Sequence, residues 1–152
     1  MTPKSAWEAI EKYIPKDKII WEPFYGDGTS GKHLSEMGFQ VIHQNIDFYE
    51  YDEGDIIISN PPFSDTKRVM DRMMLLDKPF ILIMPVSKMN TSYFRNHFVA
   101  GDKELQIIIP RKRIQFIKVV NGMVVENKNS CNFDCLYYCY KMNLPSDIVW
   151  LE

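Results

Sequence analysis

The sequence predicts a doubly wound α/β domain with a mainly parallel sheet, and three observations support this. Short apolar runs, typical of strands that are buried on both faces, alternate with segments of helical pattern over the first 110 residues. Turns that contain Gly, Pro or Asn separate these segments. After residue 110 the pattern changes to a hairpin signal and an aromatic-rich run. The 152 residues fit a single domain, 1–152, that is large enough to bury a core.

The first two thirds of the chain supply the alternating elements. Thr2-Pro3 is expected to open a capped helix that spans Ser5–Tyr13 and ends at Pro15. Further helices are expected over Gly31–Met37, which Gly38 closes, over Lys67–Leu76 and over Asn90–Val99. The apolar runs are expected to form the strands Lys18–Pro23, Phe39–His43, Asp55–Ser59, Phe80–Met84 and Leu105–Pro110.

The tail predicts antiparallel structure. Asn121-Gly122 is a strong hairpin signal and separates the runs Ile114–Val120 and Met123–Glu126. Phe133–Lys141 follows as a last strand, which would return antiparallel from the edge where the parallel strands end. Residues 111–132 would then emerge at that edge, where open α/β sheets bind their ligands, as a candidate substrate-contacting insertion.

Composition favours a soluble protein of the cytoplasm. Hydrophobic residues make up 45% of the chain and charged residues 25%, which is ordinary for a globular protein. No apolar run approaches the length of a membrane helix, and the N-terminus MTPKSAWEAI has no secretory apolar region. The odd number of cysteines (Cys131, Cys135 and Cys139) favours reduced thiols, and their spacing on a strand predicts burial without a metal site.

Charge is unevenly distributed, although the net charge is only −2. Residues 1–65 hold 5 Lys/Arg against 12 Asp/Glu, whereas residues 88–118 hold 7 Lys/Arg against Asp102 and Glu104. The basic stretch includes Arg111-Lys112-Arg113, which lies in the expected insertion. Such a stretch is compatible with a surface that contacts phosphates, and equally with an ordinary solvated face.

The first motif with chemical content is the segment from Glu22 to Gly28, with the sequence EPFYGDG. It joins the end of a predicted strand to a predicted helix through a turn with two glycines, which let the backbone approach a ligand closely. A plain tight turn has the same pattern. The absence of a full G-x-G-x-x-G run argues against a nicotinamide dinucleotide.

The second motif, Asn60-Pro61-Pro62-Phe63, is more specific and follows a buried strand. Consecutive prolines fix the backbone and remove two N–H donors. The Asn60 side-chain oxygen and the Pro61 carbonyl could accept both hydrogens of an amino group and turn its lone pair toward an electrophile. Positioning and electrostatics would then drive the reaction without a strong base, and Phe63 offers a face for an extruded base. The bland alternative is a rigid turn after a strand.

Together these motifs resemble motifs I and IV of the class I S-adenosylmethionine-dependent amino-methyltransferases, (D/E/S)-x-F-x-G-x-G and (D/N/S)-P-P-(Y/F/W), in the same order and about 35 residues apart. The resemblance covers residues 2–110 by sequence and the tail by topology, and it is strongest to the small adenine-N6 methyltransferases of phage and viral genomes. It implies a Rossmann-like fold with a seven-stranded sheet and a C-terminal antiparallel strand. It also implies S-adenosyl-L-methionine as the cofactor and the N6 amino group of adenine in DNA or RNA as the acceptor. A phage or viral protein would act in the host cytoplasm.

The resemblance also implies roles for particular residues. Catalysis is expected from Asn60, Pro61, Pro62 and Phe63. Cofactor binding is expected from the N-terminal pair Thr2 and Pro3 and, in the first motif, from Glu22, Phe24, Gly26, Asp27 and Gly28. An acidic residue after the second strand should bind the ribose; Asn45 occupies the first position considered, and Asp47 is the substitute, so both remain candidates. Substrate contacts are expected at the same edge from Ser64, Lys67, Ser87, Lys88, Arg111, Lys112 and Arg113.

Two other functions share some of these features. A protein-glutamine N5 methyltransferase uses the same chemistry on a side-chain amide. A non-catalytic subunit that binds S-adenosylmethionine or nucleic acid would also keep both motifs. The chain offers no separate domain for recognising a target sequence, which favours single-stranded, RNA or structured targets, a specificity subunit or a homodimer.

Overall fold

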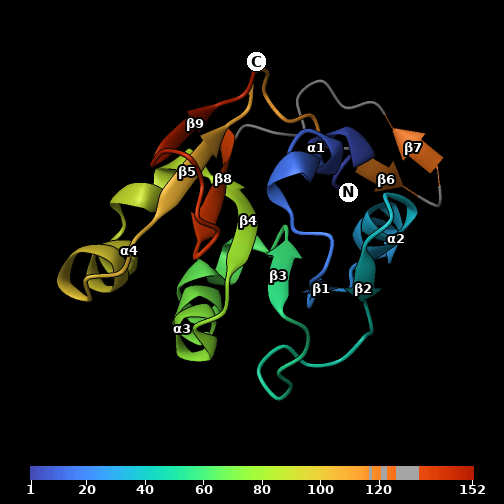
Figure 1. Cartoon of the computed structure of the whole chain (residues 1–152). Coiled ribbons are helices and arrows are strands. Elements are labelled where there is room, and N and C mark those ends of the chain that lie inside the picture. Colours follow the sequence, from blue (N-terminus) through green and yellow to red (C-terminus); the bar gives the residue numbers. More distant parts are fainter. Residues whose placement is uncertain (117, 121–122, 126–133) are drawn as a thin grey trace.

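A seven-stranded sheet runs through the computed structural model, which describes residues 1–116, 118–120, 123–125 and 134–152. The strand order is β2-β1-β3-β4-β8-β5-β9 (Figure 1). The strands are β1 (Ile19–Trp21), β2 (Gln40–Ile42), β3 (Ile56–Ser59), β4 (Phe80–Pro85), β5 (Gln106–Ile109), β8 (Cys135–Tyr140) and β9 (Ile148–Trp150). Strand β8 pairs antiparallel with β4 and β5, and the other neighbours pair parallel. The predicted α/β class, with a mainly parallel sheet and an antiparallel C-terminal strand, is confirmed.

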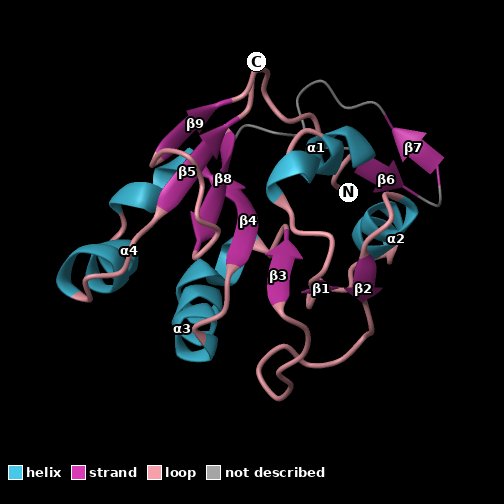
Figure 2. Cartoon of the chain, viewed as in Figure 1, coloured by secondary structure: helices cyan, strands magenta, loops and turns pink. Residues whose placement is uncertain are grey.

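Helices cover both faces of this sheet (Figure 2). They are α1 (Lys4–Glu8), α2 (Thr29–Glu36), α3 (Thr66–Leu76) and α4 (Ser92–Arg95). Successive side chains of a strand point to opposite faces, and the core divides accordingly. Ile81 of β4 lies in a cluster with residues of α1 and α2, whereas its neighbour Leu82 lies in a cluster with residues of α3 and α4. The molecule therefore has three layers.

The first predicted helix is shorter than expected. Instead of one helix over Ser5–Tyr13, the chain forms α1 and then a 3-10 turn over Glu11–Tyr13, because Ile10 leaves the helical conformation with φ −111°. Pro3 is the N-cap residue and makes no side-chain cap hydrogen bond. The expected cap by Thr2 is therefore wrong, and its hydroxyl bonds elsewhere, as described below.

The helix predicted over Asn90–Val99 is also interrupted. A 3-10 turn spans Val86–Asn90, α4 follows, and a π turn spans Asn96–Ala100. The break lies at Thr91, whose backbone is extended. Its side-chain oxygen accepts a hydrogen bond from the Phe94 N–H and so starts a new helix.

The tail contains the predicted hairpin and one strand that the pattern did not reveal. Strands β6 (Lys118–Val120) and β7 (Met123–Val125) pair antiparallel as a separate two-stranded sheet. The Asn121-Gly122 turn, Cys131 and Phe133 lie outside the described residues. Strand β9 was not predicted; it is held by parallel pairing with β5 and by burial of Val149, and neither can be seen in its sequence. This strand, and not the hairpin, completes the seven.

The direction of the strands determines where a site can form. Because β1 to β5 and β9 are parallel, their carboxyl ends meet at one edge of the sheet. The segments that leave this edge are 22–28, 43–47, 60–65, 86–91 and 110–116. Both sequence motifs therefore lie at the edge where open α/β sheets bind ligands.

Candidate functional site

Two adjoining cavities of about 530 Å³ each lie at the carboxyl ends of β1, β2 and β3. The N-terminal cavity is lined by Met1, Thr2, Glu22, Phe24, Tyr25, Gly26, Asp27, Ser30 and Asn60. The β2 cavity is lined by Pro23, Phe24, Tyr25, Gly26, Asn45, Ile46, Asp47, Phe48, Tyr49, Asn60 and Pro62. Four residues line both: Phe24, Tyr25, Gly26 and Asn60. The structure thus brings the two motifs together with Thr2, Asn45 and Asp47.

The glycine turn presents the start of α2 to these cavities. Gly26 and Gly28 have positive φ values of 57° and 85°, a conformation that L side chains rarely adopt. Gly28 is the N-cap residue of α2. The Asp27 carboxylate accepts the Thr29 N–H at 3.0 Å, and hydrogen bonds from Thr29 hold the pKa of Asp27 below its ordinary value. The turn is therefore ordered by its own hydrogen bonds.

A buried carboxyl group lies beneath this turn. Glu22 is 1% exposed, and its Oε1 accepts the Ser59 hydroxyl at 2.5 Å and the Phe24 N–H at 2.9 Å. Burial raises the pKa of Glu22 from 4.5 to about 8, although hydrogen bonds from Ser59 and from the backbone of Phe24 and Asn60 oppose the shift. Glu22 is therefore mainly protonated at neutral pH, and it links the ends of β1 and β3.

Asn60 lies at the junction of the two cavities. Its Nδ2 donates a hydrogen bond to Thr2 Oγ1 at 2.9 Å, across 58 residues of sequence. Its Oδ1 is buried and has no hydrogen-bond partner among the described residues. Buried acceptors are normally satisfied, so an acceptor without a partner is a candidate point of contact for a ligand. Asn60 can accept a hydrogen bond from a donor in this site.

The β2 cavity has aromatic walls and both candidates for the ribose contact. Asp47 Oδ1 accepts the Tyr49 N–H at 2.8 Å, which fixes the orientation of that carboxylate. Phe24 packs against Phe48 with ring centroids 4.9 Å apart. The Arg68 guanidinium lies over the Tyr49 ring, 3.7 Å from its centroid. Asn45 and Asp47 both line this cavity, so the cavity admits either assignment.

Several predicted residues lie outside the two cavities. Pro61 is buried, and Phe63 is half-buried and packs against the core cluster that contains α1 and α2, so its ring does not line either cavity. Lys88 Nζ donates to the Phe63 carbonyl at 3.3 Å and thereby ties the loop after β4 to the second motif. Ser64 and Ser87 are exposed. Lys67 is paired with Asp71 on α3 at 2.8 Å.

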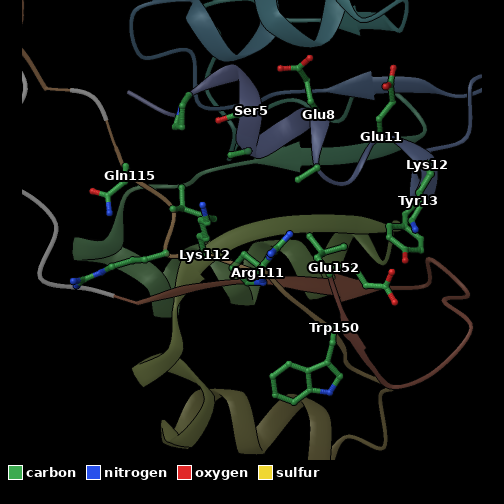
Figure 3. Close-up of a pocket in the computed structure, with 17 residues that line it drawn as sticks. Ser5, Glu8, Glu11, Lys12, Tyr13, Arg111, Lys112, Gln115, Trp150 and Glu152 are labelled. Carbon is green, nitrogen blue, oxygen red and sulfur yellow. The ribbon is translucent and has the colours of Figure 1, made fainter.

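The basic stretch lies in a larger groove of about 930 Å³ between the N-terminal helix and the ends of β5 and β9. Figure 3 shows Arg111 and Lys112 beside Trp150 and Glu152, with Glu8 and Glu11 on the facing wall. All three basic side chains are exposed; Arg113 pairs with Asp134 at 3.1 Å, and Trp150 is 71% exposed. Pro3 lines this groove and neither cavity, whereas its neighbour Thr2 lines the N-terminal cavity.

Sequence reasoning missed part of the lining. Tyr25 lines both cavities, and Phe48 and Tyr49 line the β2 cavity. The Ser59 hydroxyl donates a hydrogen bond to Glu22. Tyr25 lies inside the first motif and Ser59 directly precedes the second, so their positions in the sequence could have identified them. Nothing in the local pattern distinguished Trp150, because β9 itself was not recognised.

The described residues contain no candidate membrane span and no candidate metal site. None of their helices is long and apolar enough to cross a membrane. No group of three His, Cys, Asp or Glu side chains among them is placed to hold a metal ion. Cys135 and Cys139 are buried on β8, as predicted, and burial raises the pKa of Cys139 to about 12, so its thiol stays protonated.

Comparison with known proteins gave fold-level similarity only. No protein-family description and no curated protein match the sequence. The chain is similar in structure to a candidate RNA methyltransferase from Pyrococcus horikoshii, with a TM-score of 0.46 and 14% identity, covering 88% of this chain and 79% of the other. It is also similar to a tRNA (m1A58) methyltransferase from Aquifex aeolicus, with a TM-score of 0.46 and 13% identity, covering 92% and 69%.

Proposed function

We propose that this chain is an S-adenosylmethionine-dependent methyltransferase that modifies the N6 amino group of adenine in DNA or RNA. One observation carries the proposal. Asn60 follows β3 and precedes Pro61-Pro62, it lines both cavities, and its buried Oδ1 has no hydrogen-bond partner among the described residues. Leaving such an acceptor unpaired costs about 1–3 kcal/mol. A ligand that donates a hydrogen bond to it would remove this cost.

The residues of the two cavities fit the cofactor. Small-molecule sites have volumes of about 300–1,000 Å³ and combine apolar walls with a few polar groups, and the cavities match this description. The glycine turn and Asp27 would hold the methionine part in the N-terminal cavity. Asp47 or Asn45 would hold the ribose in the β2 cavity, between the rings of Phe24, Phe48 and Tyr49. When bound, S-adenosylmethionine supplies an electrophilic methyl group.

The second motif would then orient the acceptor. Asn60 Oδ1 would accept one N–H group of adenine, and the carbonyl of Pro61, whose residue lines neither cavity, would accept the other, so that the nitrogen lone pair points away from both and toward the methyl group. Methyl transfer would give this nitrogen a new N–C bond, would leave the electron pair of the broken S–C bond on the sulfur of S-adenosylmethionine, and would release one amino proton to solvent. The amide and the carbonyl are neutral and act by position, as preorganised dipoles do.

The groove is the proposed path for the nucleic acid. Arg111 and Lys112 are exposed and have no ion-pair partner among the described residues, so they are available to phosphates. Trp150 offers an exposed ring on which a base could stack. Pro3 lines the groove and its neighbour Thr2 lines the N-terminal cavity, so the proposed path leads from the groove past the start of the chain toward Asn60.

The test is transfer of labelled methyl groups. Purified protein is incubated with methyl-labelled S-adenosylmethionine and with duplex DNA, single-stranded DNA, RNA or protein in separate reactions, and labelled nucleic acid is digested to nucleosides. We expect label in N6-methyladenine. Asn60→Ala should lower turnover by about 10²- to 10³-fold, the usual effect of removing one preorganised hydrogen-bonding group. Asn60→Asp keeps an acceptor oxygen and should retain most of the activity.

Each other outcome has a defined meaning. Label in protein alone would replace adenine with a glutamine side chain as the acceptor. Cofactor binding without transfer to any of the four pools would indicate a non-catalytic subunit. If the protein does not bind S-adenosylmethionine, the proposal is wrong.

A further inference from the structure

The Thr2 hydroxyl has an unexpected partner. The sequence pattern placed it as a helix cap, but Pro3 occupies the N-cap position and no side chain caps α1. Thr2 is instead 3% exposed and lines the N-terminal cavity. Its Oγ1 accepts the Asn60 Nδ2–H at 2.9 Å. A hydroxyl that could have stabilised a helix is thus bonded to the central residue of the candidate site.

An asparagine needs such a partner if its oxygen is to act. Its amide carries a donor on one side and an acceptor on the other. Oδ1 can face a ligand only while Nδ2 faces something that accepts its hydrogen, because a buried donor left unpaired is costly. The nearby carboxyl of Glu22 accepts Ser59 and Phe24 through Oε1, and the hydrogen bond that Nδ2 makes is to Thr2. Thr2 Oγ1 is the partner of Nδ2, whereas Oδ1 has no hydrogen-bond partner in the part of the chain that the structure describes.

We propose that Thr2 is a positioning residue for Asn60: its hydroxyl holds Nδ2 and so keeps Oδ1 turned to the reacting amino group. This inference rests on the proposed methyl transfer. It differs from the role that the sequence resemblance gave to Thr2, which was to bind the cofactor directly. The two roles predict different kinetics, because a residue that positions Asn60 affects the reaction step and a cofactor ligand affects cofactor affinity.

Two substitutions separate the hydroxyl from the rest of the side chain. Thr2→Val keeps the shape and removes the hydroxyl, whereas Thr2→Ser keeps the hydroxyl and removes the methyl group. At saturating cofactor, we expect kcat to fall at least 10-fold in Thr2→Val and to stay within about 3-fold of wild type in Thr2→Ser. The dissociation constant for S-adenosylmethionine, measured by calorimetry, should change less than about 2-fold in both. Thr2→Ala replaces Thr2→Val if the latter does not fold.

Three results would overturn the inference. One is a Thr2→Val enzyme with the kcat of wild type. Another is a Thr2→Val enzyme that binds S-adenosylmethionine poorly but recovers full turnover when it is saturated, which would make Thr2 a cofactor ligand. The third is equal loss in Thr2→Ser and Thr2→Val, which would assign the effect to packing of the methyl group.

Asn60→Ala, measured in parallel, keeps this inference separate from the proposed function. If Asn60→Ala is inactive while Thr2→Val is fully active, only the role of Thr2 is wrong. If Asn60→Ala has the turnover of wild type, methyl transfer through Asn60 is wrong, and the role of Thr2 is wrong with it.

Discussion

Two parts of the same sheet edge hold their polar groups in opposite ways. At the ends of β1 and β3, Thr2, Glu22 and Ser59 are buried and hydrogen-bonded to their neighbours. At the ends of β5 and β9, Arg111 and Lys112 are exposed beside Trp150. The buried groups are held in one arrangement, as a reaction at a single atom requires. The exposed cations can adapt to a flexible polymer, and salt weakens their interactions.

This comparison teaches where each kind of specificity can reside. A buried polar group is costly to leave unpaired, so the set around Asn60 recognises donors and acceptors at defined positions. An exposed cation discriminates little and contributes mainly attraction. Changes in the two regions should therefore have effects of different kind and size.

The largest expected effect is on stability and comes from Glu22. Because its folded pKa, about 8, lies above the ordinary value of 4.5, the folded state binds this proton more tightly than the unfolded state does. The contribution of Glu22 to stability is thus full below pH 4.5 and is lost as the pH rises to about 8, at up to about 1.4 kcal/mol per pH unit.

Glu22→Gln isolates that contribution, because the amide keeps an oxygen for Ser59 and Phe24. The unfolding free energy of wild type minus that of the variant should decrease between pH 5 and 8 and become level above pH 8. Denaturant unfolding of both proteins at several pH values measures this difference in unfolding free energy. A difference that stays constant with pH would mean that Glu22 is not the buried, protonated group described here.

The next effect concerns the cofactor and decides between the two ribose candidates. The carboxylate of Asp47 is already oriented by the Tyr49 N–H, which leaves its second oxygen for a hydroxyl. Asp47→Asn keeps the bond to Tyr49 and removes the charge. We expect S-adenosylmethionine to bind about 10- to 100-fold more weakly, since hydrogen bonds to charged groups contribute about 1.5–3 kcal/mol. Calorimetric titration measures the dissociation constant. If Asn45→Ala loses more affinity for S-adenosylmethionine than Asp47→Asn does, the ribose contact belongs to Asn45.

The smallest expected effect lies in the groove. Replacing both Arg111 and Lys112 by Gln should raise the KM for single-stranded nucleic acid several-fold at low salt and leave cofactor affinity unchanged. The slope of log affinity against log salt should become shallower by about 1.4, or 0.7 for each charge. Lys18→Gln with Arg95→Gln is the matched control, because it removes one lysine and one arginine that are exposed, have no ion-pair partner among the described residues and line neither the groove nor the two cavities. An equal effect in both pairs would mean that the groove has no special role.

The sequence was most informative where the structure depends on local pattern. The runs that became β1 to β5 consist mostly of apolar residues, so they could be recognised without their partners. The second motif could be placed at a strand end for the same reason. The break at Thr91 and the three-residue strand β9 could not be predicted, because their signals are as weak as those of many loops.

The candidate site divides in a similar way. Asn60, Glu22 and the glycine turn were identified from the sequence, since each motif is continuous and its chemistry follows from its residue types. Three other features were not identified from the sequence: Phe63 lies outside both cavities, Arg111 lies in a separate groove, and the Thr2 hydroxyl bonds to Asn60. These depend on how loops from different strands pack against one another.

By itself, the sequence determined that this chain is a parallel α/β protein with two motifs at the carboxyl edge of its sheet. It did so because hydrophobic periodicity and turn chemistry act over a few residues. Only the tertiary structure decided that the hydroxyl of Thr2 meets the amide of Asn60, 58 residues away, and that Glu22 is buried enough to remain protonated. The physical reason is that hydrogen-bond partners and desolvation are set by which surfaces pack together, and local pattern does not encode that choice.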